Sequence, residues 1–222
     1  MSQKPKKTRP SFRGLQVLRA VAAFLVVVTH SGFYASERLS KGFHFWGRGA
    51  VGVDIFFVLS GFVMYYSSAP LLANRDGWKI FSERRLVRIV PLYWLATSVK
   101  LLVMLLAAGV VLHAKLSISK TIFAYLFIPT RDVDKLFMPL LGVGWTLNFE
   151  MFFYLLFAVA LASRRNIFLI VAPILLCFAL ASYFISPDGP AITFYANPIV
   201  LDFLWGMLIA YFYETRTPTL NW

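Results

Sequence analysis

An arginine and a histidine lie within one long apolar stretch. Arg19 and His30 are its two ionisable residues between Leu15 and Phe33. In an α-helix eleven residues make about three turns, so both side chains share one face, about 16 Å apart along the axis. Ionisable groups inside a membrane usually face a protein interior, water or a substrate path. A neutral imidazole there could accept a hydroxyl proton as a general base. The alternative is that His30 caps the helix end while Arg19 reaches the headgroup phosphates.

A glutamate is the second candidate for chemistry. Glu150 lies among aromatic residues in the apolar run 143–162, about two turns from its start. An ionised carboxylate at that depth needs a partner, and the candidates are His30, Lys100 and Arg19. We therefore favour a functional role for Glu150 over a packing role. Lys100, midway along another apolar run, has no further assignment.

Two arginines precede a third apolar run. Arg85 and Arg88 are neighbours on a helix surface because three residues separate them along the sequence. Two guanidinium groups on one face suit a polyphosphate ligand. Arginines at a cytoplasmic helix end more often set topology and contact lipid, and spacing alone favours that reading by about two to one.

Small residues and one acid mark the run from Gly49 to Phe62. Ser60 and Gly61 suit close helix packing rather than a nucleophile. Asp54 is ambiguous, because it lies near the predicted outer end and could stabilise a helix N-terminus. The single cysteine, Cys177, excludes an intramolecular disulfide and a cysteine-built metal site. The sequence shows no nucleotide-binding glycine loop or metal-binding pattern, and we expect no metal.

The composition is that of a membrane protein. Hydrophobic residues make up 59% of the 222 residues and charged residues 14%, whereas charged residues are about a quarter of an average soluble domain. The net charge of +12 could indicate nucleic-acid binding. The basic residues, however, gather at the ends of apolar runs, as the positive-inside rule requires. We therefore expect the lipid bilayer, and no nucleic acid, as a partner.

The order of apolar runs predicts an all-α fold, a polytopic bundle of about six transmembrane helices. The run 118–128 is too short to span and is predicted to be re-entrant or interfacial. Residues 1–13 would form a basic cytoplasmic tail, 14–214 the transmembrane domain and 215–222 a cytoplasmic end. The predicted spans are 15–34, 50–68, 89–112, 143–162, 167–185 and 198–213.

These motifs together resemble acyltransferase family 3, integral-membrane enzymes, mostly bacterial, that O-acylate carbohydrates and related acceptors. The resemblance covers residues 12–213. The matching segments are Arg19-x10-His30, Gly52–Phe62, Arg85-x-x-Arg88, Trp145–Glu150 with Tyr154, and Asn197–Met207 with Asp202 where glutamate is common. The match also includes Tyr93 after the arginine pair, and Trp145 with Thr146 and Leu147 before the glutamate. Family members usually have more spans, so the resemblance implies that 14–214 is the N-terminal part of the domain and that 215–222 is a truncation point.

The resemblance implies roles for these residues. Acyl-CoA, most simply acetyl-CoA, would be the donor substrate, with no bound cofactor, and Arg19, Arg85 and Arg88 would hold its phosphates. His30 would deprotonate a hydroxyl of a carbohydrate or glycolipid acceptor, or would itself be acylated. Glu150 would orient or stabilise the imidazole. The supporting residues would be Asp54, Ser60, Gly61, Tyr93 and Trp145.

Two other functions stay open from the sequence. A proton-coupled transporter would also place histidine, glutamate and lysine inside the membrane. An inactive remnant or interaction subunit would insert without binding acyl-CoA. The arginine pair and the lack of an internal repeat favour the enzyme. The predicted location is the inner (plasma) membrane with the N-terminus in the cytoplasm.

Overall fold

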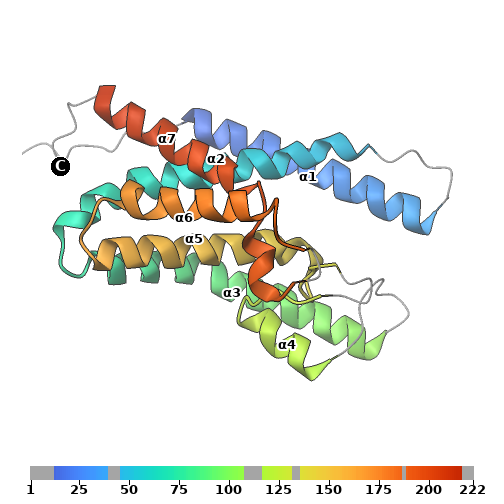
Figure 1. Cartoon of the computed structure of the whole chain (residues 1–222). Helices are drawn as coiled ribbons and strands as arrows, with labels where there is room; N and C mark the ends of the chain where they lie inside the picture. Colours follow the sequence, from blue (N-terminus) through green and yellow to red (C-terminus); the bar gives the residue numbers. More distant parts are fainter. Residues whose placement is uncertain (1–12, 40–45, 108–116, 132–135, 187–188, 217–222) are drawn as a thin grey trace, which may run out of the picture.

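The computed structural model describes residues 13–39, 46–107, 117–131, 136–186 and 189–216. These residues are helical, with one isolated antiparallel bridge between Arg131 and Phe137 and no strand. The helices are α1 (Arg13–Arg38), α2 (Val51–Ser68), α3 (Gly77–Leu106), α4 (Ile118–Tyr125), α5 (Trp145–Ala162), α6 (Ile167–Ala181) and α7 (Val200–Arg216). Short 3-10 turns are η1 (Gly47–Ala50), η2 (Ala69–Ala73), η4 (Gly142–Gly144) and η5 (Ala191–Tyr195). The long helices lie side by side in an elongated bundle (Figure 1), so the all-α prediction is confirmed.

Four helical segments of the described chain are long and apolar enough to cross a membrane: Arg13–Arg38, Gly47–Ala73, Gly77–Leu106 and Gly142–Ala162. Helices α6 and α7, with 15 and 17 residues, fall short of the usual span of about 20. The described residues thus hold four candidate membrane spans, and the count of six stays a prediction. The short run 118–128 contains α4, whose 8 residues cannot cross a bilayer. Most of the two predicted tails lies outside the described residues.

Helix α3 begins at Gly77, twelve residues before the predicted start of the third span at residue 89. Half of the additional residues are charged or polar, and they continue the helix beyond its apolar part. An apolar run therefore marks the membrane segment of a helix and not its ends. Residues 108–112, the predicted end of this span, lie outside the described residues.

Two glycines bring α2 and α7 into close contact. A Cβ atom on Gly61 would overlap the carbonyl oxygen of Phe203, and one on Gly206 would overlap the carbonyl oxygen of Val58. Small residues let backbones approach in this way, which strengthens van der Waals packing where lipid gives no hydrophobic drive. Helices α2 and α7 are therefore the most closely packed helix pair in the described part of the bundle.

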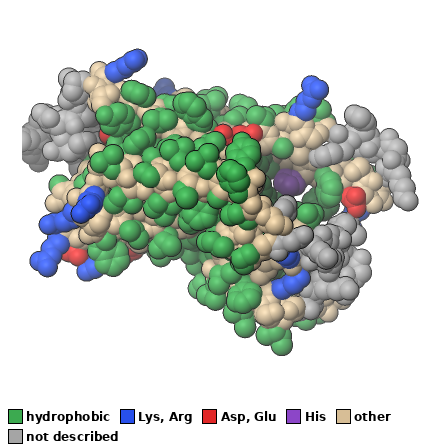
Figure 2. Space-filling view, in the orientation of Figure 1, with side chains coloured by type: hydrophobic (Ala, Val, Ile, Leu, Met, Phe, Trp, Pro, Cys, Tyr) green, Lys and Arg blue, Asp and Glu red, His purple; other side chains and the backbone are tan. Residues whose placement is uncertain are grey.

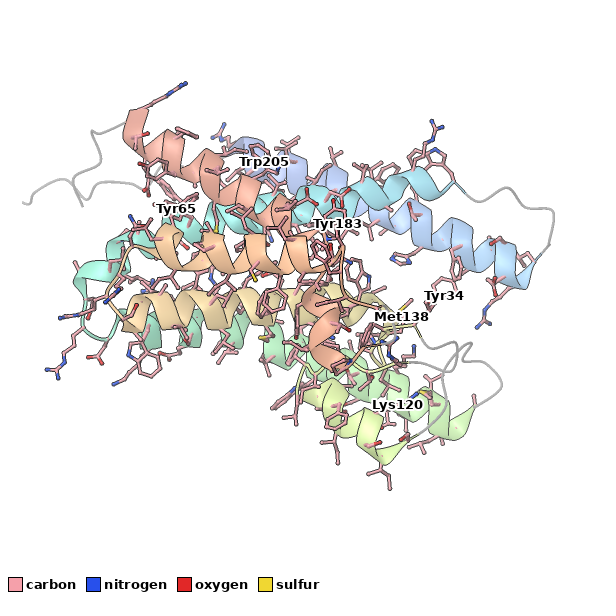
Figure 3. The ribbon with its side chains drawn as sticks, viewed as in Figure 1. Tyr34, Tyr65, Lys120, Met138, Tyr183 and Trp205 are labelled. Carbon is pink, nitrogen blue, oxygen red and sulfur yellow. The ribbon has the colours of Figure 1, made fainter. Side chains whose placement is uncertain are left out.

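Aromatic rings fill the space between α2, α5, α6 and α7. The rings of Phe153 and Phe203 are stacked with their centroids 3.8 Å apart. Helix α1, in contrast, buries only Ala22 among its described residues. Large apolar side chains cover much of the outer surface (Figure 2), and Tyr183 and Trp205 (Figure 3) are 78% and 61% exposed, as lipid-facing residues would be. The core thus lies on one side of α2 and α5, and α1 and α3 bound a space on the other.

Gly206→Ala tests the α2–α7 contact. The added methyl group has no room, so we expect the apparent unfolding temperature in detergent to fall, by the equivalent of about 1–3 kcal/mol. Gly14→Ala is the matched control, because a Cβ at Gly14 meets nothing within 4 Å. Equal unfolding temperatures for the two variants would contradict the close contact.

Candidate active site

A cavity of about 640 Å³ lies between α1, α2, α3 and the η4–α5 segment. All five residues predicted to act in catalysis or donor binding line it: Arg19, His30, Arg85, Arg88 and Glu150. Ser60 and Trp145 line it too. Motifs that are far apart in the sequence therefore meet in one space, and Figure 2 shows the surface hollowed beside the histidine side chain.

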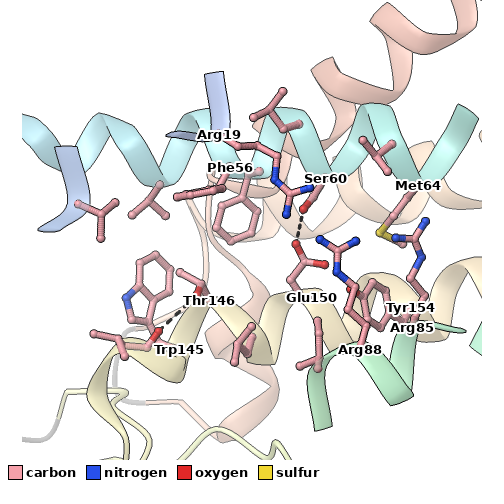
Figure 4. Close-up of a pocket in the computed structure, with 18 of the residues that line it drawn as sticks. Arg19, Phe56, Ser60, Met64, Arg85, Arg88, Trp145, Thr146, Glu150 and Tyr154 are labelled. Atoms are coloured by element: carbon pink, nitrogen blue, oxygen red, sulfur yellow. Dashed lines mark hydrogen bonds between the residues drawn. The ribbon is translucent and has the colours of Figure 1, made fainter. Parts of the chain in front are cut away.

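Arginines dominate one end of the cavity. Figure 4 shows Arg19 from α1 facing Arg85 and Arg88 from α3. The Arg85 guanidinium donates a hydrogen bond to Ser67 Oγ at 2.6 Å and lies 5.5 Å from the ring centroid of Phe81. Arg85 is thus held by α2 and by its own helix, while Arg88 is exposed. This end can bind an anion with several negative groups.

Glu150 lies at the same end. The hydroxyl of Ser60 donates a hydrogen bond to Glu150 Oε1, which joins α2 to α5. Tyr154, one turn further along α5, lines the cavity beside the carboxylate. Arg85 and Arg88 are the cations whose charges act on Glu150. The partners expected from the sequence were His30, Lys100 and Arg19, and the observed hydrogen-bond partner is Ser60 instead.

His30 lies at the other end of the cavity. Gly49, in the η1 turn that leads directly into α2, packs against Thr29, the residue before His30, so Gly49 marks the level of the histidine at the start of α2. Ser60 follows eleven residues later, which is about 16 Å along the helix. Glu150, bound to Ser60, is therefore about three turns from the level of His30. The carboxylate–imidazole pair implied by the family resemblance is not formed in this structure.

Other predicted residues lie outside the cavity lining. Tyr93 is buried against Gly144, with its ring centroid 4.4 Å from that of Phe127, and supports the start of α5. Asp54 on α2 is near enough to Asp202 on α7 for their charges to interact. Gly61 lies at the α2–α7 contact described above, and Lys100 is not part of the lining.

Sequence reasoning assigned no site role to two polar residues of the cavity. Gln16 and Tyr154 both line it, and Tyr154 lies beside Glu150. Both could have been found from helical spacing, because Gln16 is three residues from Arg19 and Tyr154 is four residues from Glu150. The contact of Ser67 with Arg85 has no such signal, since it joins two helices.

The chain resembles known proteins along most of its length. A family described as an acyltransferase domain matches residues 12–222. The exopolysaccharide production protein ExoZ of Rhizobium meliloti (strain 1021) is 38% identical over 192 residues, which are 85% of this chain and 58% of ExoZ. The acyltransferase MdmB of Streptomyces mycarofaciens is 31% identical over 106 residues, 47% of this chain and 24% of MdmB. The chain thus spans less than two thirds of either relative. No solved structure matches.

Cysteine labelling tests whether the cavity is open to water. In a Cys177→Ser background, we expect Val63→Cys in the cavity lining to react with a water-soluble methanethiosulfonate at least about tenfold faster than Leu175→Cys in the core, because the thiolate that reacts forms only where water reaches. Similar rates at the two positions would show that the cavity is closed or absent.

Proposed function

The chain belongs to the acyltransferase family whose domain it matches over residues 12–222, and we propose that it moves an acyl group from acyl-CoA to a hydroxyl group of a carbohydrate. The observation that carries this proposal is the single cavity with three arginines at one end and His30 at the other. A phosphate-rich donor and a general base are what such a transfer needs.

The donor fits the length of the cavity. We place the phosphates of coenzyme A beside Arg85 and Arg88, with Arg19 as a third cation. The pantetheine arm has about a dozen chain atoms and extends to roughly 14 Å, close to the about 16 Å between the two ends. Apolar side chains such as Val26, Val53 and Phe56 line the path between them. The thioester would then lie beside His30.

The proposed reaction is a direct transfer. His30 accepts the proton of the acceptor hydroxyl, and the oxygen attacks the thioester carbonyl carbon. The carbon–sulfur bond breaks, and the leaving thiolate takes the proton from the imidazolium. A two-step route, with the acyl group carried briefly on His30, uses the same residues. Acetyl is the proposed acyl group, from the family resemblance, and acyl-CoA is a substrate rather than a bound cofactor.

The acceptor and location follow from the relatives and from charge. ExoZ is named for exopolysaccharide production, which supports a carbohydrate or glycolipid acceptor. We propose six spans, with α6 and α7 as the shorter two, in the inner (plasma) membrane. Basic residues in 1–13 and at Arg164 and Arg165 support a cytoplasmic N-terminus. In that orientation the arginine end of the cavity would lie at the cytoplasmic side. A proton-coupled transporter would instead show substrate flux without acyl-CoA consumption.

Acetyl-CoA binding in detergent tests the donor site. We expect Arg85→Ala/Arg88→Ala to weaken binding about 100-fold or more, because two charge-assisted contacts to phosphate are lost. Arg164→Ala/Arg165→Ala is the matched control, since this exposed pair lies outside the cavity lining. Equal losses in the two double variants would contradict a specific donor site at α3.

His30→Ala tests the chemical step. We expect acyl transfer to fall roughly 10²–10⁴-fold while acetyl-CoA binding is kept, because the general base is lost and the phosphate contacts are not. Added imidazole should restore part of the rate. Normal turnover by this variant at normal protein levels would refute both the direct and the two-step route.

A further inference from the structure

Glu150 lies too far from His30 to orient or stabilise its imidazole, so its position needs another explanation. Its carboxylate accepts a hydrogen bond from Ser60 on α2. This bond holds it about three turns from the level of His30. Its environment is instead the arginine end of the cavity (Figure 4).

The electrostatics of that end are unusual for a phosphate site. Glu150, Arg85 and Arg88 line the same end of the cavity, and the charges of the arginines act on the carboxyl group. No contact ion pair joins Glu150 to an arginine in the described part of the chain. A phosphate that enters this end of the cavity would meet all three side chains.

The carboxylate has two opposite effects. Without a ligand, it offsets the charge of guanidinium groups that would otherwise be uncompensated inside a membrane protein. With a ligand, it repels the phosphates that the arginines attract. A single phosphate gains little against this repulsion, whereas a donor with several phosphates and a long apolar-walled binding path gains enough.

We propose that Glu150 is an internal counterion of Arg85 and Arg88, which balances the arginine charge in the empty site and competes with anions that enter it. This inference rests on the donor site of the proposed function and deepens it. Glu150 would then set which anions bind: small phosphates weakly, and coenzyme A because of its additional contacts. Ser60 is a positioning residue for the carboxylate.

Glu150→Gln tests the proposal, with Glu83→Gln as the matched control because Glu83 is an exposed carboxylate on α3. The probes are coenzyme A and inorganic pyrophosphate, titrated into the purified full chain in detergent, with unfolding temperatures measured with and without each probe. We expect the Kd of Glu150→Gln to fall about tenfold for both probes, the equivalent of about 1.4 kcal/mol. We also expect a lower unfolding temperature without ligand and a larger rise when ligand is added.

Other results overturn the proposal. An unchanged Kd with a shifted pH profile of turnover would make Glu150 a partner of His30, and a weaker Kd would make it only a scaffold for the arginines. If Glu150→Gln does not fold, Glu150→Met provides a second neutral side chain of similar length. The wild type could fail to bind coenzyme A while the neutral variant binds pyrophosphate more tightly. That result would refute the proposed donor and would still support the counterion role of Glu150.

Discussion

An ionised side chain in the hydrocarbon of a membrane must be surrounded by protein, water or opposite charge, because lipid cannot solvate it. Arg19, Glu150 and Arg85 all lie in helices that are long and apolar enough to span a membrane. The structure meets the constraint by turning them toward one cavity, where each faces another polar group. Because the ionisable side chains point into one cavity and away from lipid, anion-binding and proton-accepting groups lie in the same space.

The packing of the bundle keeps that space open. Gly61 and Gly206 bring α2 against α7, and aromatic rings fill the region between α2, α5 and α7. Helix α1 packs mainly against α2 and buries a single residue of its own, Ala22. The closely packed side of the molecule therefore carries Ser60 and Glu150, while α1 and α3 supply the histidine and the arginines at the edge of the core.

Helical periodicity predicts which residues share a face, and it correctly grouped Arg19 with His30 and Arg85 with Arg88. It does not predict how deep a residue on one helix lies relative to a residue on another, because that axial offset is set by packing between helices. Glu150 was accordingly expected to meet His30, Lys100 or Arg19, and its carboxylate instead accepts a hydrogen bond from Ser60. The helix bounds show the same limit: α3 begins well before its apolar part, since a polar segment can continue a helix outside the membrane.

The separation of Glu150 from His30 divides the cavity into a charged end and a proton-accepting end, and the proposed transfer requires one donor molecule to reach both. Photolabelling with an acyl-CoA that carries a diazirine in its acyl group tests this directly. We expect label on residues around His30, such as Val26 and Val53, and loss of that label in the presence of excess coenzyme A. Label confined to the arginine end, or to the outer surface of α6, would contradict it.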